Sequence, residues 1–169
     1  MKRAREEVII VYCDGACSDN GGKKAKAGIG IYFPNGEYEN VSERVDEKEK
    51  QTNNVAELTA AIKVLEIIPK TKNLKIYTDS KYVIGIATQW LESWKKKNWK
   101  RKGGPILNLD LIKKFDKLLS DRTIEWKHVK GHSKDVGNDK ADKLAASSLN
   151  RVSEKDTSSI EKNDVSVKE

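Results

Sequence analysis

The sequence predicts an α/β fold in a single domain of 169 residues, and three patterns carry this prediction. Apolar and β-branched residues fill Val8–Cys13, which is typical of a strand buried on both faces. Segments 27–33 and 38–45 have strand-like composition, and Pro34-Asn-Gly36 between them is a strong hairpin signal. Further along, helical patterns alternate with short strand-like segments. We therefore expect antiparallel strands first, followed by mixed helices and strands.

Helical periodicity and chain breakers define the remaining elements. The expected helices are 55–68, 81–94, 109–119 and 138–149, and the expected strands are 74–78 and 123–129. Gln51-Thr-Asn-Asn54 offers N-cap candidates for the first of these helices, and Pro69 ends it. Residues 8–150 are expected to form the folded domain after a short lead at 1–7. The polar tail 151–169 is expected to be disordered.

The charge of the chain favours an anionic partner. Lys and Arg number 33 against 26 Asp and Glu, and the formal net charge is +7. A well-solvated basic surface would have the same composition, but Trp94–Lys102 concentrates six basic side chains and two tryptophans with no acidic residue. Lysines bind phosphate and indoles stack on bases, so this basic segment favours contact with nucleic acid over a merely solvated cationic helix.

The cysteines and the hydropathy pattern exclude several classes of protein. Cys13 and Cys17 lack the Cys-x-x-Cys spacing of zinc sites and a second pair for a disulfide framework. We expect a reduced intracellular protein, in the cytoplasm or nucleus, and a monomer. The sequence contains neither a signal-type segment nor an apolar run long enough to span a bilayer, so no membrane partner is expected.

Four carboxylates border the predicted core near strand ends or helix starts. They are Asp14, Glu57, Asp79 and Asp142. Ordinary alternatives exist: Asp14 could begin a turn, Asp79 could cap a helix, and Glu57 could reach water from the edge of its helix. Four carboxylates at one sheet edge would repel one another unless divalent cations neutralised them. Their oxygens favour two Mg²⁺ ions, with Mn²⁺ as a possible substitute, and such a pair supports phosphodiester hydrolysis.

The two histidines have different expected roles. His128 shares a face of the last predicted strand with Ile124 and Trp126, so we expect it to pack there. His132 begins a loop and titrates near neutral pH, so it could relay protons or help to release product.

Five motifs support a more specific interpretation. They are Tyr12-Cys-Asp14-Gly15, Gln51-Thr-Asn-Asn-Val-Ala-Glu57-Leu58, Tyr77-Thr-Asp79-Ser80, Val129-Lys-Gly-His132-Ser and Gly137-Asn-Asp-Lys-Ala-Asp142. In this order and spacing, over about Val8 to Asn150, the chain resembles the type one ribonuclease H family, whose members cut the RNA strand of RNA/DNA hybrids. The resemblance implies the ribonuclease H-like fold, a five-stranded mixed sheet with three antiparallel and then two parallel strands, flanked by α-helices.

The resemblance also implies a role for each matching residue. The four carboxylates resemble the ligands of two metal ions, with Asp14 shared between the ions, and His132 resembles the proton-handling histidine. Residues expected to contact the RNA strand, largely through its 2′-hydroxyls, are Cys17, Ser18, Asn20, Asn53 and Asn54. Residues expected to hold the DNA strand are Lys50, Thr52, Trp90, Trp94, Lys95, Lys96, Trp99 and Asn108. Hydrolysis is expected to leave 5′-phosphate and 3′-hydroxyl ends.

A few positions differ from the common family pattern or bear on how the chain is used. Asp139 replaces a glutamate, Asn54 a glutamine and Lys50 an arginine, and each change reshapes a polar contact. Gly15 is expected to leave room for the backbone of the hybrid. The short lead is too small for the additional hybrid-binding module of many eukaryotic members, and Met1 with the polar tail favours a free-standing enzyme over part of a polyprotein.

Two other functions fit part of this pattern. A catalytically inactive module that binds RNA/DNA hybrids or double-stranded RNA would need the basic segment, but it has little reason to keep four repelling carboxylates. A DNA-acting nuclease of the same fold would need the carboxylates but not the asparagines at positions 20, 53 and 54. A metal-dependent hybrid endoribonuclease accounts for both sets of residues.

Overall fold

The computed structural model describes residues 7–130 and 135–151. Within them, five strands form one sheet in the order β3-β2-β1-β4-β5. The strands are β1 (Val8–Ser18), β2 (Lys26–Tyr32), β3 (Val41–Arg44), β4 (Asn73–Thr78) and β5 (Ile124–His128). β1, β2 and β3 pair antiparallel, whereas β4 pairs parallel with both β1 and β5. The predicted five-stranded mixed sheet is confirmed. β3 is shorter than the predicted 38–45, because the Asn40 side chain accepts the Phe33 N–H at 2.9 Å in the turn before it.

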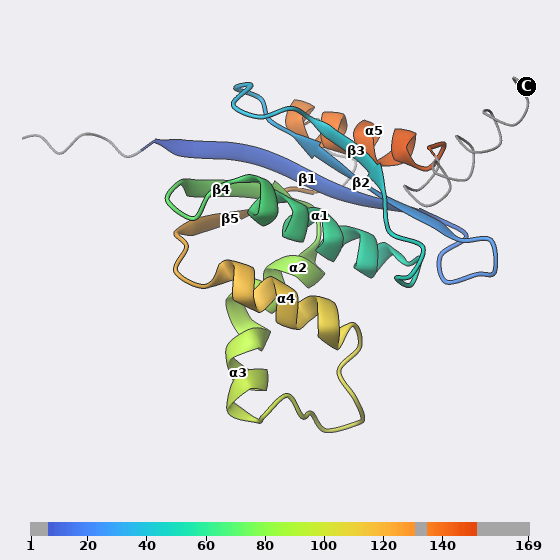
Figure 1. Cartoon of the computed structure of the whole chain (residues 1–169), viewed down its shortest axis with the longest axis vertical. Coiled ribbons are helices and arrows are strands. Elements are labelled where there is room, and N and C mark those ends of the chain that lie inside the picture. Colours follow the sequence, from blue (N-terminus) through green and yellow to red (C-terminus); the bar gives the residue numbers. More distant parts are fainter. Residues whose placement is uncertain (1–6, 131–134, 152–169) are drawn as a thin grey trace, which may run out of the picture.

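Helices cover both faces of the sheet (Figure 1). They are α1 (Asn53–Ile67), α2 (Lys81–Gly85), the π-helical segment η1 (Ile86–Trp90), α3 (Leu91–Lys96), α4 (Leu109–Leu119) and α5 (Val136–Ser148). Figure 1 shows α5 on one side of the sheet and α1 and α4 on the other, with α3 and the loop after it extending away from the sheet. Among the helices of the described residues, none is long and apolar enough to cross a membrane.

β1 continues past the point where its apolar composition ends. Its parallel pairing with β4 stops at Tyr12, but its antiparallel pairing with β2 reaches Ser18. Asp14 therefore lies inside the strand, opposite Gly30, and the alternative that it begins a turn is wrong. The hydrogen-bonding groups of β2 extend the strand, which residue composition alone does not reveal.

The two faces of β1 are buried unequally. Ile9, Val11 and Cys13 are buried, whereas Ile10 and Tyr12 on the opposite face are only half-buried. The predicted burial on both faces therefore holds fully for one face and partly for the other.

Glycines in the sheet allow both flanking helices to approach closely. A Cβ at Gly15 would lie 2.5 Å from backbone atoms of Ala56 and Glu57 in α1. A Cβ at Gly30 would lie 2.2 Å from the carbonyl oxygen of Ala141 in α5. Only glycine allows these contacts. The packing of α1 thus requires glycine at position 15, and the expectation that Gly15 leaves room for a hybrid stays a prediction.

Side-chain caps fix the helix starts near the predicted site. The hydroxyls of Thr52 and Ser80 each accept a backbone hydrogen bond at 3.1 Å, from the first turns of α1 and α2. Asp135 caps α5 in the same way at 2.9 Å. Because Ser80 is the cap of α2, the alternative that Asp79 caps this helix is wrong.

The segment after α2 departs from a regular helix. In η1 the ring of Trp90 lies against Gly85, where a Cβ would be 2.6 Å from the indole. The helix then ends at Lys96, and Asn98 and Trp99 adopt positive φ angles of 55° and 62°. The basic segment is therefore part helix and part tight turn, rather than the continuous cationic helix that its composition suggests.

Candidate active site

Two strands place carboxylates at the same edge of the sheet. The last parallel pair between β1 and β4 joins Tyr12 to Tyr77. Asp14 and Asp79 each follow this pair by two residues, and parallel strands bring such positions to a common edge. Asp14 is only 2% exposed, whereas Asp79 is half-buried.

Helix α1 adds a third carboxylate to this edge. The backbone N–H of Gly15 donates to Oδ1 of Asp14 at 2.9 Å and to Oε2 of Glu57 at 3.1 Å. One carboxylate oxygen from each of Asp14, Glu57 and Asp79 lies within 4.8 Å of the others. The structure thus brings together three of the four predicted metal ligands.

The fourth predicted ligand, Asp142, comes from α5. It is exposed and lines the same cavity of about 140 Å³ as the other three carboxylates. Asp142 lies outside the 4.8 Å cluster, but its side chain hydrogen-bonds to Asp14. Asn138, which was not predicted, and Asp139 also line the cavity. Helical periodicity could have found Asn138, because residues four apart share a helix face. We call this space the carboxylate cavity.

Burial and mutual repulsion raise the pKa values in the carboxylate cavity. Burial, followed by the charges of Glu57 and Asp79, raises the pKa of Asp14 to about 10. Burial and the charge of Asp79 raise the pKa of Glu57 to about 8, although hydrogen bonds from Asp14 and Gly15 act in the opposite direction. Burial also raises the pKa of Asp79. Without a cation, the carboxyls of Asp14 and Glu57 therefore retain protons near neutral pH.

This donor set fits hard divalent cations. Carboxylate oxygens are the ligands that Mg²⁺ and Mn²⁺ prefer, whereas structural zinc sites use sulfur and nitrogen ligands. A divalent cation that replaced the protons would attract each carboxylate and offset both their mutual repulsion and the cost of burying their charges. The electrostatics of the cavity and its ligand chemistry therefore agree.

The predicted RNA contacts come from two segments that touch. Cys17 and Ser18 end β1 and Asn20 lies in the loop that follows, whereas Asn53 and Asn54 begin α1. Oδ1 of Asn20 accepts a hydrogen bond from the backbone N–H of Asn53 at 2.9 Å. The three asparagines are exposed. Folding thus joins two segments that lie more than 30 residues apart in the sequence.

A second cleft, of about 400 Å³, lies between the α2–η1–α3 segment and the start of α4. We call it the tryptophan cleft. Four of the predicted substrate contacts line it: Asn54, Trp90, Trp94 and Asn108. Tyr82 and Arg101 line it as well, without having been singled out. Nδ2 of Asn108 donates to the Tyr82 hydroxyl at 3.1 Å. Arg101 belongs to the basic segment, whereas nothing in the sequence marks Tyr82.

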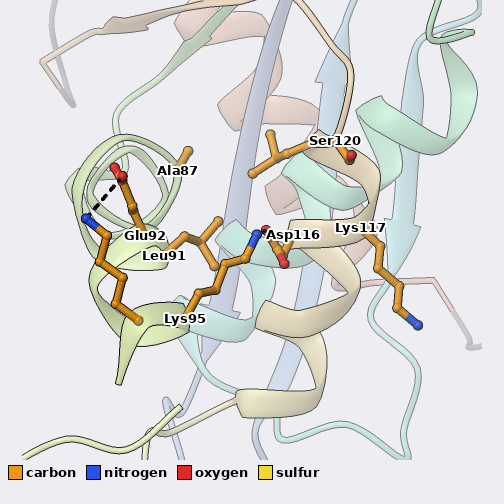
Figure 2. Close-up of a pocket in the computed structure, with 9 residues that line it drawn as sticks. Ala87, Leu91, Glu92, Lys95, Asp116, Lys117 and Ser120 are labelled. Atoms are coloured by element: carbon orange, nitrogen blue, oxygen red, sulfur yellow. Dashed lines mark hydrogen bonds and ion pairs between the residues drawn. The ribbon is translucent and has the colours of Figure 1, made fainter. Parts of the chain in front are cut away.

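Two predicted lysine contacts lie elsewhere. Lys95 and Lys96 line a separate groove between α3 and α4. Figure 2 shows Lys95 reaching toward Asp116, and the Lys95 Nζ is 3.2 Å from Oδ1 of Asp116. Lys96 pairs with Glu92 at 3.5 Å. Both charges are thus partly neutralised on a different side of α3 from the tryptophan cleft.

The remaining predicted site residues have varied surroundings. Trp99 is half-buried and packs against the core, Thr52 caps α1, and Lys50 is exposed beside it. His132 lies outside the described residues, so its role stays a prediction. His128 is exposed, and the expectation that it packs is wrong because it ends an edge strand.

Comparison with known proteins decides the family. A family model described as RNase H matches residues 6–150. The chain belongs to the ribonuclease H family. The chain is also 42% identical to "Ribonuclease HI" of Rickettsia conorii over 139 residues, which cover 81% of this chain and 88% of the relative. The assignment made from the sequence motifs, to ribonuclease H of type one, is confirmed.

Individual ribonuclease H relatives cover different shares of their own length. The chain is 41% identical to "Ribonuclease H" of Ruthia magnifica subsp. Calyptogena magnifica over 148 residues, which cover 86% of this chain and 97% of the relative. It is 41% identical to "Ribonuclease H1" of Mus musculus over 143 residues, which cover 82% of this chain and 49% of the relative. The chain thus spans about half the length of this mammalian relative.

Solved structures agree with the ribonuclease H fold. The crystal structure of LC9-RNase H1, a type 1 RNase H with the type 2 active-site motif, matches with a TM-score of 0.68 and 25% identity. The match covers 88% of this chain and 74% of that one. The predicted ribonuclease H-like fold is confirmed.

Proposed function

We propose that this ribonuclease H family member hydrolyses the RNA strand of RNA/DNA hybrids in an endonucleolytic, metal-dependent reaction. One observation carries the proposal: the oxygens of Asp14, Glu57 and Asp79 lie within 4.8 Å of one another in a chain of this family. Relatives named ribonuclease H support the reaction class. The proposed products carry 5′-phosphate and 3′-hydroxyl ends.

The proposed cofactor is a pair of Mg²⁺ ions, with Mn²⁺ as a possible substitute. The proposed ligands are Asp14, Glu57, Asp79 and Asp142. When bound, such a pair supplies an activated water and stabilises negative charge on the leaving oxygen. Asp14 is the proposed shared ligand, because its side chain interacts with both Glu57 and Asp142 and is the most deeply buried of the four carboxylates.

Groups of the protein itself orient this cluster. The Gly15 N–H donates to both Asp14 and Glu57 and fixes the two side chains relative to β1. The sheet encloses Asp14, whereas Asp142 is exposed, so the scissile phosphate is proposed to approach from the Asp142 side. His132, which precedes α5 in the chain, is the proposed residue for handling protons.

The proposed hybrid-binding surface has one part for each strand. For the RNA strand, the contacts are Cys17, Ser18, Asn20, Asn53 and Asn54, and 2′-hydroxyls are the groups that distinguish RNA from DNA. For the DNA strand, Thr52 and Asn108 bind a phosphate with Lys50 beside them, and Trp90 and Trp94 offer stacking surfaces. Lys95, Lys96 and Trp99 are proposed to support this strand through positive potential and packing, since they lie outside the tryptophan cleft.

Cleavage of three substrates tests the proposal. A labelled RNA/DNA hybrid, duplex DNA and duplex RNA of one sequence are incubated with Mg²⁺ and, in parallel, with EDTA. We expect cuts in the RNA strand of the hybrid alone, and only with Mg²⁺. Binding without cuts would favour an inactive binding module, and preferential cutting of duplex DNA would favour a DNA-acting nuclease.

The proposed partner is the RNA/DNA hybrid. The monomeric state, the intracellular location and the domain boundaries at 8–150 stay predictions from the sequence. Light scattering on the purified chain, alone and with hybrid, measures the oligomeric state.

A further inference from the structure

Gln51 joins the two segments that carry the proposed RNA contacts. Its backbone carbonyl accepts hydrogen bonds from the Cys17 thiol at 3.3 Å and from the Gly21 N–H at 3.1 Å. These two donors lie at either end of the stretch that contains Ser18 and Asn20. Because Gln51 directly precedes the cap of α1, its carbonyl ties this loop to the start of the helix.

The Gln51 side chain holds that carbonyl in place. Its Oε1 accepts the backbone N–H of Ala27 at 2.8 Å. Its Nε2 donates to the carbonyl oxygens of Asp46 and Glu49, both at 3.0 Å. The carboxamide therefore uses its oxygen and both of its N–H groups, and a carboxylate of the same shape could not make the two donor contacts. Gln51 is also half-buried, which restricts its rotation.

The consequence concerns the spacing of two asparagines. Oδ1 of Asn20 accepts the Asn53 N–H at 2.9 Å, and this bond leaves the Nδ2 donors of Asn20 for a ligand. A shift of loop 17–21 relative to α1 would separate the two side chains. We infer that Gln51 is a positioning residue for RNA recognition, which clamps loop 17–21 to α1 so that Asn20 and Asn53 contact the same RNA strand. The inference rests on the proposed function.

Steady-state kinetics of the full chain separate this role from a purely structural one. KM and kcat are measured with the RNA/DNA hybrid, and Ki is measured for duplex DNA of the same sequence as a competitor. We expect Gln51→Ala and Gln51→Glu to raise KM about tenfold, the effect of one or two weakened hydrogen bonds. The kcat and the Ki are expected to change by less than about twofold, because the hydrogen bonds that hold the carboxylates and the Thr52 cap do not involve Gln51.

Lys48→Gln is the matched control for Gln51→Glu. It lowers the net charge by one unit in the same loop, as Gln51→Glu does, and leaves the hydrogen bonds of Gln51 intact. It should keep the wild-type ratio of KM to Ki. A similar loss of preference in Lys48→Gln would assign the effect to charge and overturn the inference.

Further outcomes separate the inference from the proposed function. The inference is wrong if wild type prefers hybrid and both Gln51 variants keep the full preference. It is also wrong if kcat falls and Ki rises by the same factor as KM rises. If wild type shows no preference, the proposed function fails, and the inference fails with it. Should the variants not fold, hydrogen exchange of wild type decides: the Gly21 and Ala27 amides should exchange as slowly as strand amides, and exchange at exposed-loop rates would overturn the clamp.

Discussion

The carboxylate cavity and the tryptophan cleft are built in different ways. In the cavity, strand register and glycine contacts determine where the carboxylates lie: Asp14 is fixed opposite Gly30, and Gly15 lets α1 bring in Glu57. The cleft is built from η1 and from the loop before α4, which Asn108 closes with a φ of 61°. The sheet and its close packing with α1 position the carboxylate cavity, whereas irregular helix and loop position the tryptophan cleft.

This difference matches what each site is proposed to do. A water and a phosphate must be positioned for reaction to well within about 1 Å, so the reacting groups benefit from a rigid support. Stacking on bases and contacts to phosphates tolerate small shifts, because every base offers a flat face and every phosphate a charge. Substitutions in the cavity should therefore cost far more than those in the cleft.

The largest difference is expected between Asp79 and Asp139, which both line the cavity. Asp79→Asn should lower kcat by on the order of 10³-fold or more, because it removes a proposed metal ligand. Asp139→Asn should cost less than about tenfold, since Asp139 lies outside the ligand cluster and pairs with Lys143 at 3.1 Å. Cleavage of labelled hybrid at saturating Mg²⁺ measures both. Equal losses would show that the cavity acts through its total charge rather than through individual ligands.

A glycine pair tests the rigid support itself. Gly15→Ala should lower the free energy of unfolding by about 3 kcal/mol, because the new methyl group would overlap the α1 backbone. Gly36→Ala should cost only about 1 kcal/mol, because its φ of 73° is strained for alanine but nothing lies within 4 Å. Urea unfolding compares the two variants. A smaller effect at Gly15 than at Gly36 would contradict the close packing of α1.

The raised pKa values of the cavity predict a dependence of stability on pH. The folded-state pKa of about 10 for Asp14 and about 8 for Glu57 exceeds the value near 4 of an unfolded chain, so the folded protein binds more protons between these values. In EDTA, the free energy of unfolding should therefore fall as pH rises from about 5 to about 9, by at most about 1.4 kcal/mol per pH unit for each group.

Urea unfolding at several pH values measures this slope. Saturating Mg²⁺ should weaken or reverse it, because the cation binds the charged carboxylates of the folded protein. Asp14→Asn should flatten the slope in EDTA. A free energy of unfolding that does not change over this pH range in EDTA would contradict the raised pKa values of Asp14 and Glu57.

The smallest effects are expected around the tryptophan cleft. Trp90, which is 39% exposed, offers a stacking surface, so Trp90→Ala should raise KM for hybrid about tenfold with little change in kcat. Lys95→Gln should raise KM by less than about twofold, because Asp116 already neutralises this exposed lysine. Steady-state kinetics at physiological salt compare the two. A larger effect at Lys95 would move the DNA-strand contact to the groove of Figure 2.

The sequence predicted which carboxylates gather in the cavity, because short local patterns in the sequence mark their positions. A strand shows as an apolar run, and the carboxylates follow such runs or interrupt a helix face, as Glu57 does in the row of Ala61 and Val64. Thr52 was among the cap candidates for the same reason, since a capping hydroxyl lies within three residues of the N–H that it accepts.

Other features depend on contacts that local patterns do not encode. The extension of β1 through Asp14 requires β2 as a partner, and the pairing of Lys95 with Asp116 requires α4 to fold back beside α3. The hydropathy pattern does not reveal the π-helical segment η1, which places Trp90 against Gly85. The sequence therefore predicted which carboxylates lie together better than it predicted which side chains share a cleft.

The most direct test of the proposed active site is cleavage of a hybrid whose two strands carry different labels, by wild type and by Asp14→Asn shown to be folded. With Mg²⁺, wild type should cut only the RNA strand, whereas Asp14→Asn should bind the hybrid and cut neither strand. Cleavage by Asp14→Asn at the wild-type rate would contradict the assignment of the carboxylate cavity as the site of hydrolysis.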